Sequence, residues 1–134
     1  MPLTPVETPS LFDSAQFGFS QAIVATGSRT LYLAGQAALD RELNVLHEGD
    51  LGAQMSAVLA SIAQTVEAAG GAKENLARLT IFVVDYTPDK LDIIAGALKA
   101  FAQDGVPPVN SVIGVAALAL PGLMVEIEAT AVLP

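Results

Sequence analysis

The distribution of apolar residues most constrains the fold of this chain: they lie on one face of each predicted helix but on both faces of the predicted strands. Residues 51–66 carry apolar side chains at the spacing of a single helix face, and residues 87–104 repeat that pattern over a shorter stretch. The strand-like stretches 77–86 and 111–118 are instead apolar on both faces, which is typical of a sheet covered twice. Because two helices cover only one face of a sheet, we expect an α+β sandwich whose second face is covered by a partner subunit.

The predicted order of elements is β-β-α-β-α-β-β, in a single domain that spans residues 1–134. Residues 1–16 are rich in Pro, Thr and Ser and are expected to form an irregular lead-in. Residues 20–39 hold two β-rich runs around Thr26-Gly27-Ser28, which indicates a hairpin. The last strand is expected at 123–132.

Residues with a preference for helix ends mark the limits of both predicted helices. Asp50 suits an N-cap, because its side chain can accept a hydrogen bond from a free amide of the first turn. Gly70-Gly71 is typical of a helix end. Thr87 followed by Pro88 is a good start for the second helix, which is expected to end near Asp104.

Composition limits where the chain works and what it binds. Hydrophobic residues make up 52% of the sequence, yet no apolar run reaches the roughly 18 residues that span a bilayer. The N-terminal MPLTPVETPS lacks the basic and apolar regions of a signal peptide, so we expect a cytoplasmic protein without a membrane partner. A net charge of −8 with only six Lys plus Arg disfavours binding to nucleic acid. The absence of cysteine excludes disulfides and thiolate chemistry.

Two carboxylates interrupt the apolar run LMVEIEATAV at 123–132. Glu126 and Glu128 are two apart and therefore share one face of the predicted strand, whereas Val125 and Ile127 face the other way into the core. An unpaired buried carboxylate would be very costly, so the glutamates face solvent, a subunit boundary or a cleft. The pattern leaves two interpretations open: solvated or paired side chains, or a general acid/base that acts through a water.

Other chemistry-bearing residues form no recognisable site. His47 is the only histidine and lies in a polar loop beside Glu48, so no metal site is expected. No histidine lies at a suggestive spacing from Ser20, Ser28 or Ser111, which disfavours a serine triad. No glycine-rich phosphate loop is present, and we expect no cofactor.

Four stretches together resemble the YjgF/RidA family of reactive intermediate deaminases, also labelled endoribonuclease L-PSP. They are FSQAI…LYLAGQAALD, EGDLGAQMSAVLASIAQTVEAAGG, LTIFVVDY and PPVNSVIGVAAL…VEIEATAV, and the similarity runs over about residues 17–133. The resemblance implies a chorismate-mutase-like α+β fold and a homotrimer whose open sheet faces form a central barrel. It also implies a small-molecule cleft at each subunit boundary.

The resemblance assigns roles to six residues. Glu126 matches the glutamate that positions the hydrolytic water, and Gly35 matches the glycine of a cleft-lining turn in which Ala34 replaces the usual serine. Phe19 falls where a cleft tyrosine is usual. In the family's P-x-R-S motif an arginine grips the substrate carboxylate. Here PPVNS places Asn110 at the arginine position, followed by the matching Ser111.

Asparagine at position 110 changes what the cleft is expected to hold. It keeps a hydrogen-bonding head but has no charge and cannot make a bidentate ion pair. Losing such an arginine typically costs about 2–5 kcal/mol of binding to a carboxylate. No other Arg or Lys is placed by spacing as a substitute in the same subunit, although a neighbouring subunit could supply one. We therefore expect inefficient hydrolysis of 2-aminoacrylate-type imines.

The sequence leads to two functional hypotheses. The first is a divergent deaminase acting on a small imine or enamine, in which Glu126 orients water and Asn110 holds a polar group of the substrate. The alternative is a non-catalytic trimeric protein that binds a small molecule. A ribonuclease, suggested only by the family's older label, is disfavoured by the net charge of −8 and the absence of a basic cluster.

Overall fold

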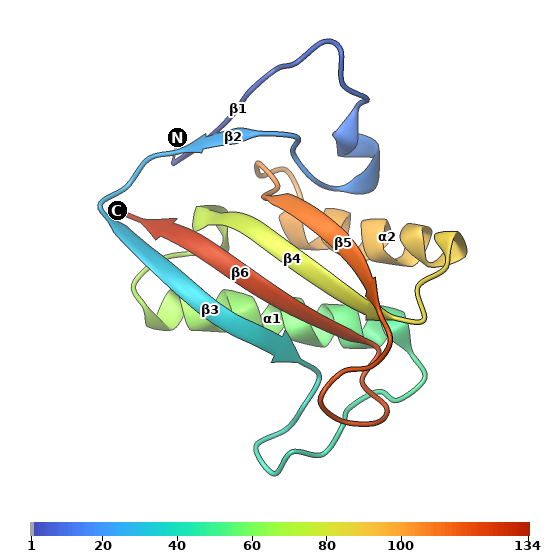
Figure 1. Ribbon diagram of the computed structural model, residues 1–134. Helices are drawn as coiled ribbons and strands as arrows, with labels where there is room; N and C mark the ends of the chain where they lie inside the picture. The colour runs from blue at the N-terminus through green and yellow to red at the C-terminus, as the bar shows by residue number, and fades with distance from the viewer. Residues whose placement is uncertain (1) are drawn as a thin grey trace.

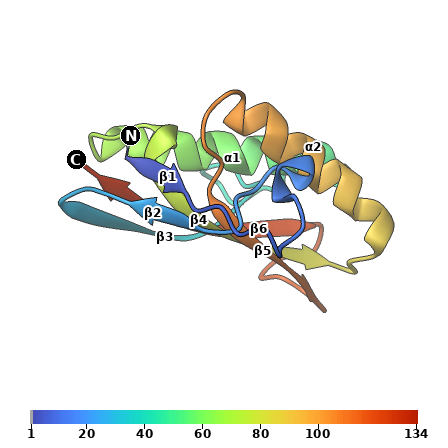
Figure 2. The same cartoon turned by 90° about the horizontal axis from the view of Figure 1, so that it is seen from above.

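The body of the molecule is a four-stranded sheet with two helices packed on one of its faces (Figure 1). The computed structural model describes residues 2–134. The sheet has the order β3-β6-β4-β5, with β4 and β5 parallel and the other pairs antiparallel. Its strands are β3 (Arg29–Ala37), β4 (Leu76–Val84), β5 (Val109–Val115) and β6 (Val125–Leu133). Helices α1 (Leu51–Ala68) and α2 (Leu91–Ala102) lie on the same side (Figure 2), which confirms the expected α+β layering.

Local signals explain where the helices begin and end. The Asp50 side chain accepts a hydrogen bond from the Ala53 amide at 3.0 Å, so Asp50 is the N-cap of α1, as predicted. The chain leaves α1 through Gly70, whose φ of 91° is readily adopted only by glycine. A short 3-10 turn, η3 (Pro88–Lys90), precedes α2, and Thr87 makes no side-chain capping bond. Pro88 starts this turn because its fixed φ suits a first helical position.

The core lies between the helices and the sheet. Strand β6 alternates strictly, so that its odd-numbered residues from Val125 to Leu133 are buried and its even-numbered residues are not. The apolar face of α1 packs against the buried residues of β6. Its side chains there include Met55, Val58 and Ile62, which are 0% exposed. Burying one such side chain stabilises the fold by roughly 1.5–3 kcal/mol. The face of the sheet that points away from the helices is called the open face below.

The hairpin expected at 20–39 is wrong. Strand β2 (Ile23–Ala25) pairs with β1 (Leu3–Pro5) in a separate two-stranded sheet, whereas β3 pairs with β6. Between β2 and β3 the chain runs against the end of β6. The Ser28 amide donates to the Leu133 carbonyl at 2.9 Å, and a Cβ at Gly27 would lie only 2.3 Å from that oxygen. Gly27 therefore allows the backbone to pass close to β6 on its way from the small sheet to the large one. It does not form a turn between two paired strands.

The lead-in expected to be irregular at 1–16 contains regular structure. It holds β1 and the start of a 3-10 helix, η1 (Ser14–Phe17), which is capped by Asp13 accepting from the Ala15 amide at 3.0 Å. Strand β1 spans only three residues and ends on a proline, so composition conceals it. Just after η1, the Ser20 hydroxyl donates to the Pro107 carbonyl at 2.6 Å and so fixes the chain to the residues that precede β5.

Neither helix within residues 2–134 combines the length and the apolar character that crossing a bilayer requires.

Candidate functional site

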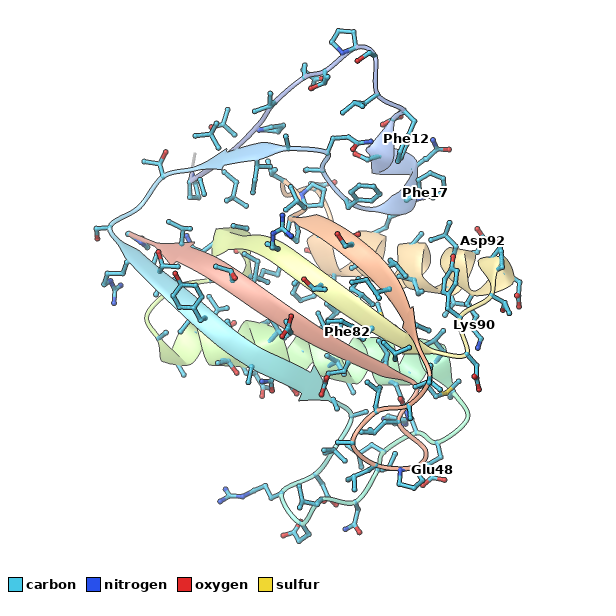
Figure 3. The ribbon with its side chains drawn as sticks, viewed as in Figure 1. Phe12, Phe17, Glu48, Phe82, Lys90 and Asp92 are labelled. Atoms are coloured by element: carbon cyan, nitrogen blue, oxygen red, sulfur yellow. The ribbon has the colours of Figure 1, made fainter. Side chains whose placement is uncertain are left out.

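Glu126 and Glu128 lie on the open face, as the alternation predicted. In the antiparallel pairing of β6 with β4, Glu126 is opposite Phe82 and Glu128 is opposite Thr80. Figure 3 shows Phe82 on the face of the sheet that points away from the helices. Glu126 is partly buried and Glu128 is exposed. The two carboxylates therefore share a face but differ in their contact with solvent.

A β-bulge shapes the surroundings of Glu126. Leu33 pairs with Ala129 and Gln36 pairs with Ile127, so that Ala34 and Gly35 together oppose the single residue Glu128. A Cβ added at Gly35 would lie 2.7 Å from Cδ of Glu126, which means that the glutamate side chain lies directly over the glycine. Any larger residue at position 35 would displace the carboxylate. Glu126, Ala34 and Gly35 are called the Glu126 corner below.

Asn110 lies on the opposite face of the same sheet. It is paired with Leu79 of β4, a residue that is 0% exposed beneath the helices. Residues paired across neighbouring strands share a face, so Asn110 points toward α2 and away from Glu126. Ser111 falls on the open face, where it is exposed. One chain alone therefore does not bring Asn110 and Glu126 together.

Asn110 opens into an apolar cavity of about 160 Å³ between β5, α2 and η1, called the Phe pocket below. Phe12, Phe17 and Phe19 form one wall, and Phe12 meets the other two rings edge-on at centroid distances of 5.9 and 6.1 Å. Figure 3 shows Phe12 and Phe17 beside α2. The opposite walls are built from α2 and β5, by Leu91, Ile94, Leu98 and Val112.

The Asn110 amide is the one polar side chain of the Phe pocket within the described chain. Its Nδ2 is buried and has no hydrogen-bond partner among residues 2–134. A buried donor without a partner costs roughly 1–3 kcal/mol relative to a paired one. Such a group in a cavity is therefore a candidate contact for a ligand that carries an acceptor.

Two lysines of the chain donate hydrogen bonds to backbone carbonyls. Lys90 donates to the Asp85 carbonyl at 2.6 Å, and Lys73 donates to the Phe101 carbonyl at 2.6 Å. Arg78 lies on the open face, where it lines a separate hollow of about 240 Å³ together with Glu128 and Tyr32. No charged residue of the described chain lines the Phe pocket. The pocket is therefore neutral in a protein whose net charge is −8.

Gln54 is a buried polar residue that no sequence pattern singles out. It is 0% exposed on α1, where a strictly apolar stripe was expected. Its Nε2 donates to the carbonyls of Leu46 and Gly122 at 3.1 and 3.0 Å, and its Oε1 accepts from the Met124 amide at 2.8 Å. Gln54 thus links α1 to two neighbouring loops. One of its partners, Met124, lies two residues before Glu126.

The structure divides the six residues assigned by resemblance into two groups. Gly35 lies beneath the Glu126 side chain in the β3 bulge that also contains Ala34, and Phe19 shares the Phe pocket with Asn110 on the helix side. The remaining residue, Ser111, is exposed on the open face. No group of three His, Cys, Asp or Glu side chains suited to hold a metal ion occurs within the described part of the chain.

Phe12, Phe17 and the α2 residues were not predicted from the sequence as walls of a cavity. A signal was present, because three of the chain's five phenylalanines fall within residues 12–19. Aromatic residues clustered in a polar segment need a partner surface, and here that surface is α2. The spacing of α2 gave only a core stripe, since the same residues serve as core and as cavity wall.

Comparisons with known proteins agree with the fold and with the resemblance. The family model described as endoribonuclease L-PSP matches residues 13–133. A RutC family protein of Synechocystis is 31% identical over 117 residues, which cover 87% of this chain and 86% of the relative.

Solved structures extend this agreement to three dimensions. YyfB, a Yersinia pestis protein of the conserved Rid family, is 38% identical with a TM-score of 0.94 over 99% of this chain and all of that one. YyfA, of the same family and organism, is 26% identical with a TM-score of 0.69 over 98% of this chain and 99% of that one. Since the family model spans nearly the whole chain and the fold agrees throughout, the protein belongs to the YjgF/RidA family, also described as endoribonuclease L-PSP.

Proposed function

We propose that this protein is a divergent, cytoplasmic RidA-like deaminase that hydrolyses a small imine or enamine. Water adds to the C=N carbon of the imine, the C–N bond then breaks, and a carbonyl compound and ammonia leave. Glu126 orients the water, and Asn110 holds a polar group of the substrate. The reaction needs neither metal nor cofactor in this scheme, and nucleic acid is no partner. The observation that carries the proposal is the partly buried Glu126 side chain held over Gly35 at the bulge.

The proposed working form is a homotrimer. The open face leaves large apolar side chains uncovered in the single chain: Tyr32 is 78% exposed and Ile113 is 42% exposed. Covering this face with neighbouring subunits would remove them from water. A cleft at the subunit boundary would then join the Glu126 corner of one subunit to the Phe pocket of the next, which overcomes the separation of Glu126 and Asn110 within one chain.

Glu126 suits the role of a water-orienting group. A carboxylate accepts a hydrogen bond from water and takes up a proton as the oxygen attacks, which typically accelerates such a step by about 10²- to 10⁴-fold. The bulge in β3 places Gly35 beneath the Glu126 side chain, and β-bulges are frequent next to active sites because they redirect a side chain. Glu128 has the same chemistry and the same strand face, but it is exposed.

The test compares the two glutamates directly. Imines are generated in the assay by an amino-acid oxidase or an amine oxidase from several precursors, and the release of carbonyl product and ammonia is followed. We expect the protein to accelerate hydrolysis of at least one imine over buffer. Glu126→Gln should lower kcat by about 10²- to 10⁴-fold, while the matched control Glu128→Gln should retain the wild-type rate.

Two results would contradict the proposal. One is the absence of acceleration over buffer for every imine tested. The other is full activity in Glu126→Gln, which would show that the carboxylate does not act on the reacting atoms.

A further inference from the structure

The feature that says most about the chemistry of the ligand is the unpaired Asn110 amide in the Phe pocket. Nδ2 is a donor, and none of the residues 2–134 supplies it with an acceptor. A ligand that satisfies it must therefore present an acceptor atom to β5. The neighbouring Val112 and the rings of Phe17 and Phe19 offer only apolar contact.

The size and lining of the pocket favour an organic ligand over water. An apolar cavity of about 150 Å³ lined by Leu, Ile and Phe holds a benzene-sized molecule, and a buried water needs two to four polar partners. The Phe pocket has about 160 Å³ and the described chain gives it one polar side chain, Asn110. A six-membered ring or a branched alkyl group of similar size fits these dimensions.

The absence of charged residues in the lining of the described pocket determines whether a charged or an uncharged acceptor group can bind there. A carboxylate placed against Asn110 would lose its hydration without meeting a cation, because no charged residue of the described chain lines the pocket. An uncharged carbonyl or hydroxyl oxygen accepts the same hydrogen bond at a much smaller desolvation cost.

We propose that the Phe pocket selects an uncharged ligand: a compound with an aryl or branched alkyl group and one neutral acceptor, such as a ketone, ester or amide oxygen, that takes the hydrogen bond of Asn110 Nδ2. This inference deepens the proposed function by naming its substrate class. The imine would carry a neutral acyl group where a carboxylate would otherwise be gripped by arginine.

The test uses three unreactive probes of nearly equal size on the full-length protein in its solution assembly. Acetophenone has an aryl ring and a neutral acceptor, benzoate has a ring and a charge, and toluene has the ring alone. Dissociation constants come from NMR titration, in which the side-chain amide signal of Asn110 reports contact. We expect acetophenone to bind at least about tenfold more tightly than benzoate, and about 3- to 10-fold more tightly than toluene.

A substitution at position 110 tests whether the preference for acetophenone over toluene comes from the Asn110 amide. Asn110→Leu should remove the advantage of acetophenone over toluene while toluene still binds. Gln64→Leu makes the same chemical change on the exposed side of α1 and should leave the probe order unchanged. The comparison among probes on the wild-type protein stands even if Asn110→Leu fails to fold.

Several outcomes would overturn the inference: benzoate binding as tightly as acetophenone, no preference for acetophenone over toluene, or no saturable binding of acetophenone up to its solubility. These outcomes are separable from failure of the proposed function. The probes are not imines, so selective binding without imine hydrolysis rejects the deaminase alone. Hydrolysis restricted to carboxylate-bearing imines rejects the neutral substrate class alone.

Discussion

Gly35 is the residue on which the position of Glu126 depends. Its missing side chain leaves the space that the glutamate occupies, with a virtual Cβ only 2.7 Å from Cδ of Glu126. The atoms that would be pushed belong to the far end of a flexible side chain and not to the backbone. Stability and activity should therefore respond differently to a substitution at this position.

Gly35→Ala should lower imine hydrolysis by at least about tenfold, because even a displacement of about 1 Å costs a reacting group much of its effect. The free energy of unfolding should change by less than about 1 kcal/mol, because Glu126 can rotate away. Steady-state kinetics and urea denaturation measure the two quantities. Wild-type activity in this variant would show that the Glu126 corner does not need its observed geometry.

Gly96→Ala is the matched control, and it carries a prediction of its own. Gly96 lies in α2, and a Cβ there would meet no other atom within 4 Å. Alanine in a helix interior is more stable than glycine by roughly 0.5–1 kcal/mol, so the free energy of unfolding should rise by that amount. Activity should stay unchanged. Destabilisation by this substitution would contradict the packing described for α2.

Gln54→Leu should destabilise the protein by about 2–4 kcal/mol. The Met124 amide and the carbonyls of Leu46 and Gly122 would lose a buried partner, and an unsatisfied buried polar group costs roughly 1–3 kcal/mol. Urea denaturation with Gln64→Leu as the exposed control on the same helix measures the difference. Equal stability of the two variants would show that the loops do not depend on the Gln54 bonds.

At the scale of elements, one carboxylate organises the turn at residues 40–44 in the loop between β3 and α1. Asp40 accepts from the amide of Asn44 at 2.8 Å, from its side-chain Nδ2 at 3.0 Å and from the Glu42 amide at 2.9 Å. These donors, the Asn44 backbone first, lower the pKa of Asp40 below 3.8. The charged form is therefore the one that the folded loop favours.

The loop should accordingly loosen in acid. Because the folded pKa lies below the unfolded value of 3.8, the stabilisation is fully present above that value and is lost as the pH falls through the lower, folded pKa. Carboxyl-carbon NMR should show Asp40 titrating below 3.8, with the Asn44 amide signal shifting in parallel. In Asp40→Asn the Asn44 shift should disappear. Titration of Asp40 at or above 3.8 would contradict the bonding described.

The elements that the sequence predicted well are those whose signals are local. Asp50 caps α1 by a bond to a neighbour three residues away, and the alternation in β6 needs only its own residues. The hairpin at 20–39 failed because strand pairing is non-local. The β-rich runs on either side of Gly27 are real strands, but their partners are β1 and β6. Nothing in the two runs encodes which strand each will meet.

The candidate site follows the same division. The shared face of Glu126 and Glu128 came from a period of two, and the family resemblance supplied Gly35 and Asn110. The Phe pocket could not be predicted, because its walls come from η1, α2 and β5, which are far apart in sequence. That Asn110 lies on the opposite face from Glu126 likewise depends on the register of three different strands.

At the scale of the whole molecule, the two faces of the sheet have different needs. The helices bury one face, while Tyr32 and Ile113 remain in water on the other. We expect sedimentation equilibrium at micromolar concentration to report three chains of 13.7 kDa each. Ile113→Asp should shift the population toward monomer, because a charge would be buried without a partner. Gln64→Asp, on the exposed side of α1, should leave the assembly intact. A monomeric wild-type protein would contradict the proposed boundary cleft.

The parallel pairing of β5 with β4 has a consequence for how the molecule comes apart. A parallel neighbour is reached only by a crossover, here through α2. Parallel pairing such as that of β5 with β4 is slightly less stable per residue than the antiparallel pairing of β6 with β4. At the edge of the sheet β5 bonds to one neighbour only, whereas the interior strand β6 bonds to two. Partial unfolding should therefore disrupt the Phe pocket around Asn110 first, while Glu126 on the interior strand β6 keeps its position. Ligand binding would then require the fully folded chain, and a partly unfolded molecule would release its ligand while Glu126 was still in position.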